Sequence, residues 1–211
     1  MTVKQKGFEL TARSIIEDLH KRNMQGFFCE TGKDAVDLIL SQLPEGASIG
    51  WGGSETIKEI GLLDALKEGN YDLIDRATAR NAEESRALYG RMAMADAFLM
   101  SSNAITERGE LVNIDGAANR LACLLHGPKE VYVIVGMNKL VKDVPAGLGR
   151  IRSIACPANT LRLGRKTPCA LTGRCGDCFG DDSICSEIVI TRRSSQPGRI
   201  KVFLVAEDYG F

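Results

Sequence analysis

The stretch Val131-Tyr132-Val133-Ile134-Val135 decides the fold, because it is apolar at almost every position. A strand with this pattern is buried on both faces, which is typical of parallel sheets that carry helices on each side. Helical stretches alternate with further short apolar segments, and this alternation predicts an α/β fold with a Rossmann-like parallel, or mostly parallel, sheet flanked by helices. The other predicted strands are 27–29, 47–51, 72–74, 97–101, 111–114, 153–156, 188–191 and 200–205.

Helices are predicted between these strands, and their starts carry capping signals. Thr31 and Asp34 have the spacing of a capping box, and Asn81 is placed to cap a later helix. The predicted helices cover 10–24, the residues after Thr31, 54–67, 82–96 and 117–126. With 211 residues the chain has the length of one domain, 1–211, interrupted by a Cys-rich loop at about 162–186 and a polar connector at 192–199 with hairpin residues.

Charge and hydropathy exclude several classes of protein. The chain has 27 basic and 27 acidic residues, so no net field attracts polyanions, and we expect no nucleic-acid partner. The apolar runs are far shorter than the about 20 residues that cross a bilayer, so we expect no membrane insertion. The N-terminal residues 1–6 have no apolar signal region, which predicts a cytoplasmic protein.

A glycine-rich turn, Ile49-Gly50-Trp51-Gly52-Gly53-Ser54, leads from a predicted strand into a predicted helix. Glycine lets the backbone approach a ligand closely, and the free amides at a helix start favour an anion. The turn therefore predicts binding of a phosphate or carboxylate group at Gly52, Gly53 and Ser54. The alternative is a tight turn in which Ser54 only caps the helix.

Polar residues gather after the strand that ends at Ser101 and around the next strand. In open α/β sheets, ligands bind beyond the carboxyl ends of strands, so these residues are candidates for a site. Glu107 and Asp115 can serve as general acid or base if burial raises their pKa, and Lys139 after the 131–135 strand can complete an anion site. The alternatives are residues that stabilise turns and a solvated lysine. The candidate ligand-binding residues here are Asn103, Thr106, Asn113, Asn119 and Arg120.

Four of the seven cysteines lie within 17 residues: Cys169, Cys175, Cys178 and Cys185. In a reducing compartment such a group indicates a metal or redox site more than structural disulfides. The two-residue gap between Cys175 and Cys178 lets both thiolates meet one metal, so the group could hold zinc or an iron-sulfur cluster. Free thiols and redox-labile disulfides are the alternatives.

Together, four motifs resemble the lactate-utilisation (LUD) domain family, and the resemblance spans roughly residues 10 to 205. It implies a fold similar to the ribose-5-phosphate isomerase, glucosamine-6-phosphate deaminase and CoA-transferase superfamily. It also implies that a small anionic metabolite binds the glycine-rich turn at Gly52, Gly53, Ser54 and Thr56. The motifs are Gly52-Gly53-Ser54-Glu55-Thr56 with 59–62, Ser102-Asn103-Ala104-Ile105-Thr106-Glu107 with Gly109, Asn113-Ile114-Asp115-Gly116 with Asn119-Arg120, and Val135-Gly136-Met137-Asn138-Lys139-Leu140-Val141.

The resemblance implies a function as the small subunit of a bacterial lactate-oxidising system that works beside iron-sulfur protein subunits. The first expectation is therefore an accessory or redox-associated subunit of a lactate-to-pyruvate system. Two others stay open: a free-standing enzyme acting on a small phosphorylated or carboxylate metabolite, and a non-catalytic ligand sensor.

Overall fold

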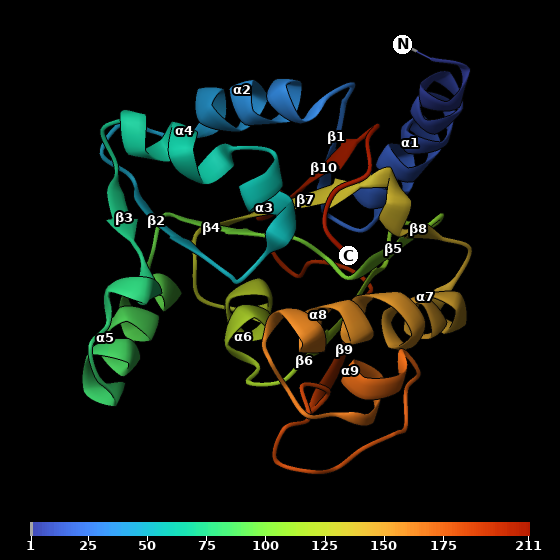
Figure 1. Ribbon diagram of the computed structural model, residues 1–211. Helices are drawn as coiled ribbons and strands as arrows, with labels where there is room; N and C mark the ends of the chain where they lie inside the picture. Colours follow the sequence, from blue (N-terminus) through green and yellow to red (C-terminus); the bar gives the residue numbers. More distant parts are fainter. Residues whose placement is uncertain (1) are drawn as a thin grey trace.

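Strand β7 (Glu130–Gly136) lies inside a six-stranded parallel sheet, here called sheet A, in the computed structural model, which describes residues 2–211 (Figure 1). The prediction of a mostly parallel sheet flanked by helices is confirmed. The strand order is β1 (Gln25–Cys29), β10 (Ile200–Val205), β7, β4 (Ala97–Met100), β2 (Ser48–Trp51) and β3 (Asp72–Ile74).

The two faces of sheet A are covered by different helices, as the apolar sequence of β7 requires. Val131, Val133 and Val135 pack on one face, while Tyr132 and Ile134 pack on the other. The first layer is α1 (Val3–Lys21), α5 (Ala82–Ala93) and α6 (Asn119–Leu125), and the second is α2 (Gly32–Gln42), α3 (Glu55–Glu59) and α4 (Leu62–Glu68). In Figure 1, α2 and α4 lie on one side of the sheet, and α5 and α6 lie on the other.

The predicted strands 111–114 and 188–191 belong to a second, four-stranded sheet, sheet B, which also contains two short strands that the sequence did not predict. Its order is β8 (Leu140–Val141), β5 (Ala104–Thr106), β6 (Leu111–Asp115) and β9 (Glu187–Thr191), and β6 runs antiparallel to both of its neighbours. The chain passes from sheet A to sheet B through residues 101–103 and again through 137–139. The connector 192–199 leads back from β9 to β10, so it joins two sheets and forms no hairpin.

The predicted strand 153–156 is wrong, because these residues are helical. Helix α7 (Val144–Arg150) passes into a π-helical turn (Ile151–Ala155) and then into α8 (Cys156–Arg162). Ile151 and Ala155 are buried four residues apart, which is a helical period, and they pack against sheet B. Pro157 cannot donate a backbone hydrogen bond, which is consistent with a shifted helical ladder just before it.

Two other predicted elements differ in detail. The predicted helix 54–67 is divided into α3 and α4 at Gly61, whose φ is +76°. The Cys-rich segment contains one short helix, α9 (Pro168–Thr172), and is otherwise irregular over 173–186. No helix within 2–211 has the length and apolar character needed to span a membrane.

Candidate functional site

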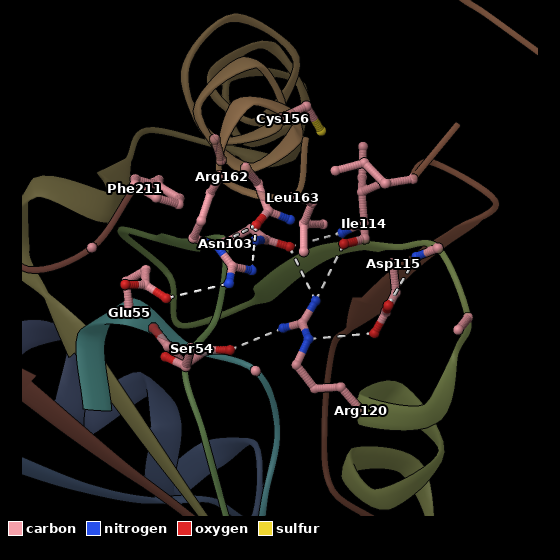
Figure 2. Close-up of a pocket in the computed structure, with 18 of the residues that line it drawn as sticks. Ser54, Glu55, Asn103, Ile114, Asp115, Arg120, Cys156, Arg162, Leu163 and Phe211 are labelled. Atoms are coloured by element: carbon pink, nitrogen blue, oxygen red, sulfur yellow. Dashed lines mark hydrogen bonds and ion pairs between the residues drawn. The ribbon is translucent and has the colours of Figure 1, made fainter. Parts of the chain in front are cut away.

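A cavity of about 500 Å³ lies where the chain crosses between the two sheets. Three crossing or strand-end segments form its inner part: 53–56 after β2, 101–103 after β4, and Lys139 after β7. The outer part comes from α8, from residues 181–184 of the Cys-rich segment and from Gly210 and Phe211 (Figure 2).

Lys139 lies deep in this cavity, with its side chain held by two hydroxyl groups. Its Nζ donates hydrogen bonds to Thr56 Oγ1 at 2.6 Å and to Ser101 Oγ at 3.0 Å, and the residue is 3% exposed. Burial is the main cause that lowers the pKa of Lys139 to about 7, and the nearby Arg150 adds to the effect. The neutral form of this amine is therefore more accessible than that of an exposed lysine.

Arg120 organises the strand ends behind the cavity. Its terminal nitrogens donate to the backbone carbonyls of Ser101 and Ile114, at 2.9 and 3.2 Å, and to the side-chain oxygen of Asn103 at 3.2 Å (Figure 2). They also donate to the side-chain oxygen of Asn113 at 2.7 Å. These four hydrogen bonds use all four N–H donors of the two terminal nitrogens. Arg120 therefore positions the cavity wall.

The remaining donor of Arg120 faces Asp115, with 3.3 Å between Nε and Oδ2. Both side chains are largely buried, and the pair lies at the edge of the cavity. The Asp115 backbone carbonyl also accepts a hydrogen bond from Ser186 N at 3.0 Å. Asn119 donates to Tyr89 OH and accepts from Arg120 N. These contacts connect β6, α6 and the Cys-rich segment around one buried ion pair.

The charges that line the cavity favour an anion. Five lining side chains are basic and three are acidic. Among the basic ones, Arg76 follows β3 and donates to Tyr89 OH at 3.2 Å, and Arg162 pairs with Glu55 at 3.4 Å. Arg76 is not among the site residues predicted from the sequence, although its position beyond the carboxyl end of a predicted strand is a usable signal.

Most of the predicted site residues come together at this cavity. Those that line it are Gly53, Ser54, Thr56, Asn103, Asp115, Asn119, Arg120 and Lys139. Asn113 is fully buried beneath it, and its side chain also donates to Ser102 Oγ at 3.1 Å. Gly52 lies against Arg120: a Cβ at Gly52 would be 3.0 Å from Arg120 Cγ, so this glycine leaves room for that side chain.

Two predicted residues lie elsewhere, and their expected place is corrected. Glu107 is exposed in the turn between β5 and β6, and Thr106 is buried there in contact with Glu110. The chain does not turn into a helix after Ser101; it continues into β5, which carries both residues to the end of sheet B away from the cavity. A catalytic role for Glu107 and a ligand role for Thr106 at this site are therefore not supported.

The four cysteines of the predicted metal site do not form a shared centre. Within the described chain, 2–211, no group of three or more His, Cys, Asp or Glu side chains could hold a metal ion, so as they lie they do not fit zinc or an iron-sulfur cluster. Cys169 is buried and contacts the hydroxyls of Thr160 and Thr167, at 3.5 and 3.2 Å.

Cys185 instead lies 3.4 Å, sulfur to sulfur, from Cys156, a cysteine outside the predicted set. The contact with Cys156 and the positive charge of Arg152 lower the pKa of Cys185 to about 7, while the same contact and burial raise the pKa of Cys156.

Solved structures with a similar fold include a DUF162 family protein from Deinococcus radiodurans, with a TM-score of 0.54 and 14% identity over 96% of this chain and 98% of that one. This likeness supports the α/β fold. Weaker matches are eIF2B delta from Chaetomium thermophilum (TM-score 0.34, 16% identity, 68% of this chain and 55% of that one) and the tetrameric eIF2B-beta2-delta2 complex from C. thermophilum (0.39, 15%, 93% and 59%).

No curated protein matches the chain. The family model of the LUD domain, in contrast, matches residues 12–205, which contain both sheets and nearly the whole cavity. The chain therefore belongs to the LUD domain family, which is linked to lactate utilisation.

Proposed function

We propose that this chain is an accessory or redox-associated subunit of a system that converts lactate to pyruvate, and that it holds a small anionic metabolite in the cavity between the sheets. Membership of the LUD family supports the link to lactate. Oxidation of lactate to pyruvate releases two electrons, and iron-sulfur protein subunits are the acceptor that we propose for them. The position of Lys139 carries the anion-binding part of the proposal.

The contacts of Lys139 explain why an anion would bind there. An ammonium group has three N–H donors. Two of those on Lys139 are bound to Thr56 and Ser101, which leaves one for an oxygen of a carboxylate or phosphate. The charged amine loses water by burial, so an anion that replaces the lost solvation gains a charge-assisted hydrogen bond. Arg76 and Arg162 add positive charge at the cavity wall.

The test is titration calorimetry of the full chain with lactate, pyruvate and inorganic phosphate. Lys139→Met keeps the length of the side chain but removes the charge, and we expect it to weaken binding about tenfold to a hundredfold, because hydrogen bonds to charged groups contribute about 1.5–3 kcal/mol. Lys142→Met is the matched control: Lys142 is exposed and lies outside the cavity lining, so we expect unchanged affinity. Equal affinity of the Lys139→Met variant and the wild type would refute the site.

A second candidate function, a free-standing enzyme for a small carboxylate or phosphorylated metabolite, is favoured by one observation. With its pKa lowered to about 7, Lys139 has a neutral fraction at pH 7 that could accept a proton or attack a carbonyl carbon. Turnover of such a metabolite by the isolated chain, abolished by Lys139→Met, would favour the enzyme. Lactate-dependent electron transfer only in the presence of iron-sulfur subunits would favour the accessory subunit.

A further inference from the structure

The proposed lactate function makes no use of the contact between Cys156 and Cys185, which lies at the outer part of the cavity. Among residues 2–211 it is the one sulfur-to-sulfur contact within hydrogen-bonding range, although 29 positions separate the two residues. We infer that Cys156 and Cys185 form a reversible dithiol–disulfide pair in the wall of the cavity, which exchanges with external disulfides.

Independent backbone contacts hold the two cysteines beside each other. Cys156 begins α8, and its backbone N–H donates to Ile151 O in the π-helical turn. On the other side, Ser186 N donates to Asp115 O at 3.0 Å, so the residue after Cys185 is anchored to β6. The segment also packs closely on β6, since a Cβ at Gly116 would be 3.1 Å from the Cα of Ile184. The pair therefore results from two anchored backbones.

The sulfur atoms are close enough to bond after a small side-chain rotation. They lie 3.4 Å apart, and a disulfide bond is about 2.05 Å long. Cys175 and Cys178, which are separated by only two residues in the sequence, have no corresponding contact within the described chain. The geometry thus favours a link between α8 and the Cys-rich segment over a link within the segment.

The two cysteines differ in their accessibility to solvent, and the more accessible one is expected to react first. Cys185 is exposed, whereas Cys156 is 6% exposed and packs with sheet B. Cys185 as thiolate attacks one sulfur of an external disulfide RSSR, forming Cys185–S–S–R and releasing RS⁻. Cys156 then loses its proton to solvent and attacks Cys185 Sγ, releasing the second RS⁻. Two thiols of the chain are oxidised, and one external disulfide is reduced to two thiols.

The disulfide would act on the shape of the cavity. Cys156 lies in the cavity wall (Figure 2), and Ser183 and Ile184, next to Cys185, line the same cavity. A bond between the two sulfurs would join α8 to residues 183–185 covalently. The redox state of the pair would therefore fix or release one side of the cavity.

The test is disulfide mapping of the full chain after treatment with glutathione disulfide as the probe, with metal content measured on the same sample. After alkylation and digestion, we expect the peptides of Cys156 and Cys185 to be linked. Cys156→Ser should stop the reaction at a glutathione adduct on Cys185, and Cys185→Ser should give neither link nor adduct at Cys156. Cys175→Ser is the matched control, an exposed thiol of the same segment, and should give the wild-type link.

Three results would overturn the inference: a Cys175–Cys178 link as the main product, no link at all, or a reduced chain with one metal ion per chain that Cys185→Ser removes. The wild-type mapping does not depend on whether a variant folds. The readout is also independent of anion binding, so its failure would leave the proposed function untouched.

Discussion

At the scale of single residues, the proposed anion site predicts that ligand binding depends on pH through Lys139. An anion bound beside Lys139 stabilises its charged form, so binding raises the pKa of this amine above its value of about 7 and takes up a proton. Affinity should therefore be highest below pH 7 and fall as pH rises through it, by at most about tenfold per pH unit because one proton is linked.

Calorimetry with lactate or pyruvate between pH 6 and 9 measures this effect, because both ligands keep a single negative charge over that range. The Lys139→Met variant should lose the pH dependence together with the affinity. A wild-type affinity that stays constant across the range would contradict the linkage.

Arg120 is expected to be the residue of the cavity whose loss most reduces stability. Arg120→Ala would remove five polar contacts at once and leave the buried carboxylate of Asp115 without its ion pair. Breaking a buried pair costs about 3–5 kcal/mol in the free energy of unfolding. Arg91→Ala is the control, because Arg91 pairs with Asp72 at the surface with both side chains about half exposed, where we expect a loss of about 1 kcal/mol or less. Urea unfolding compares the two, and equal losses would contradict the buried network.

At the scale of elements, Gly61 explains why one predicted helix becomes two. It takes a left-handed φ of +76° between α3 and α4, and a Cβ there would meet no atom within 4 Å. Gly61→Ala should therefore lower the free energy of unfolding by about 1 kcal/mol through backbone strain alone.

Gly90 lies within α5, and the same substitution is expected to stabilise the protein there. A Cβ at Gly90 would also meet no atom within 4 Å, but the φ of Gly90 is not positive. Gly90→Ala should raise the free energy of unfolding by about 0.5–1 kcal/mol, because alanine loses less conformational freedom in a helix. Thermal or urea unfolding of both variants tests the contrast in sign, and the same sign for both would contradict it.

The strands that the sequence did not predict are short, and one helical segment has residues that are also common in strands. Strand β5 has three residues and β8 has two, too few to show an alternating pattern. Residues 153–156 alone have a composition that suggests a strand. With Ile151 included, the spacing of Ile151 and Ala155 indicates one helical face.

At the scale of the whole molecule, the sequence predicts the parallel sheet and a ligand site beyond the carboxyl ends of its strands, where the cavity lies. Both depend on local signals: long apolar strands such as 131–135, glycine before a helix, and the rule that parallel strands end at one edge. The family assignment rests on the same segments and is confirmed by the match over residues 12–205.

The parts that the sequence could not give depend on contacts between distant segments. The neighbours of Glu107 are decided by the pairing of β5 with β6, and those of Cys185 by the way 183–186 packs on Asp115 and Gly116. No spacing along the chain encodes such contacts. For that reason the sequence predicts Glu107 at the site, where it does not lie, and gives no indication that Cys156 lies beside Cys185.

The crossing of the chain between two sheets makes the cavity open to redesign. Its anchor, Lys139 with Thr56 and Ser101, belongs to the ends of sheet A, whereas one wall comes from the Cys-rich segment, which adds no strand to either sheet. A grafted segment or a library of replacements between residues 163 and 184 could thus present new groups to an anion bound at the proposed site, while Lys139, Thr56 and Ser101 stay unchanged. Binding of the anion and selection among anions would then depend on different segments of the chain.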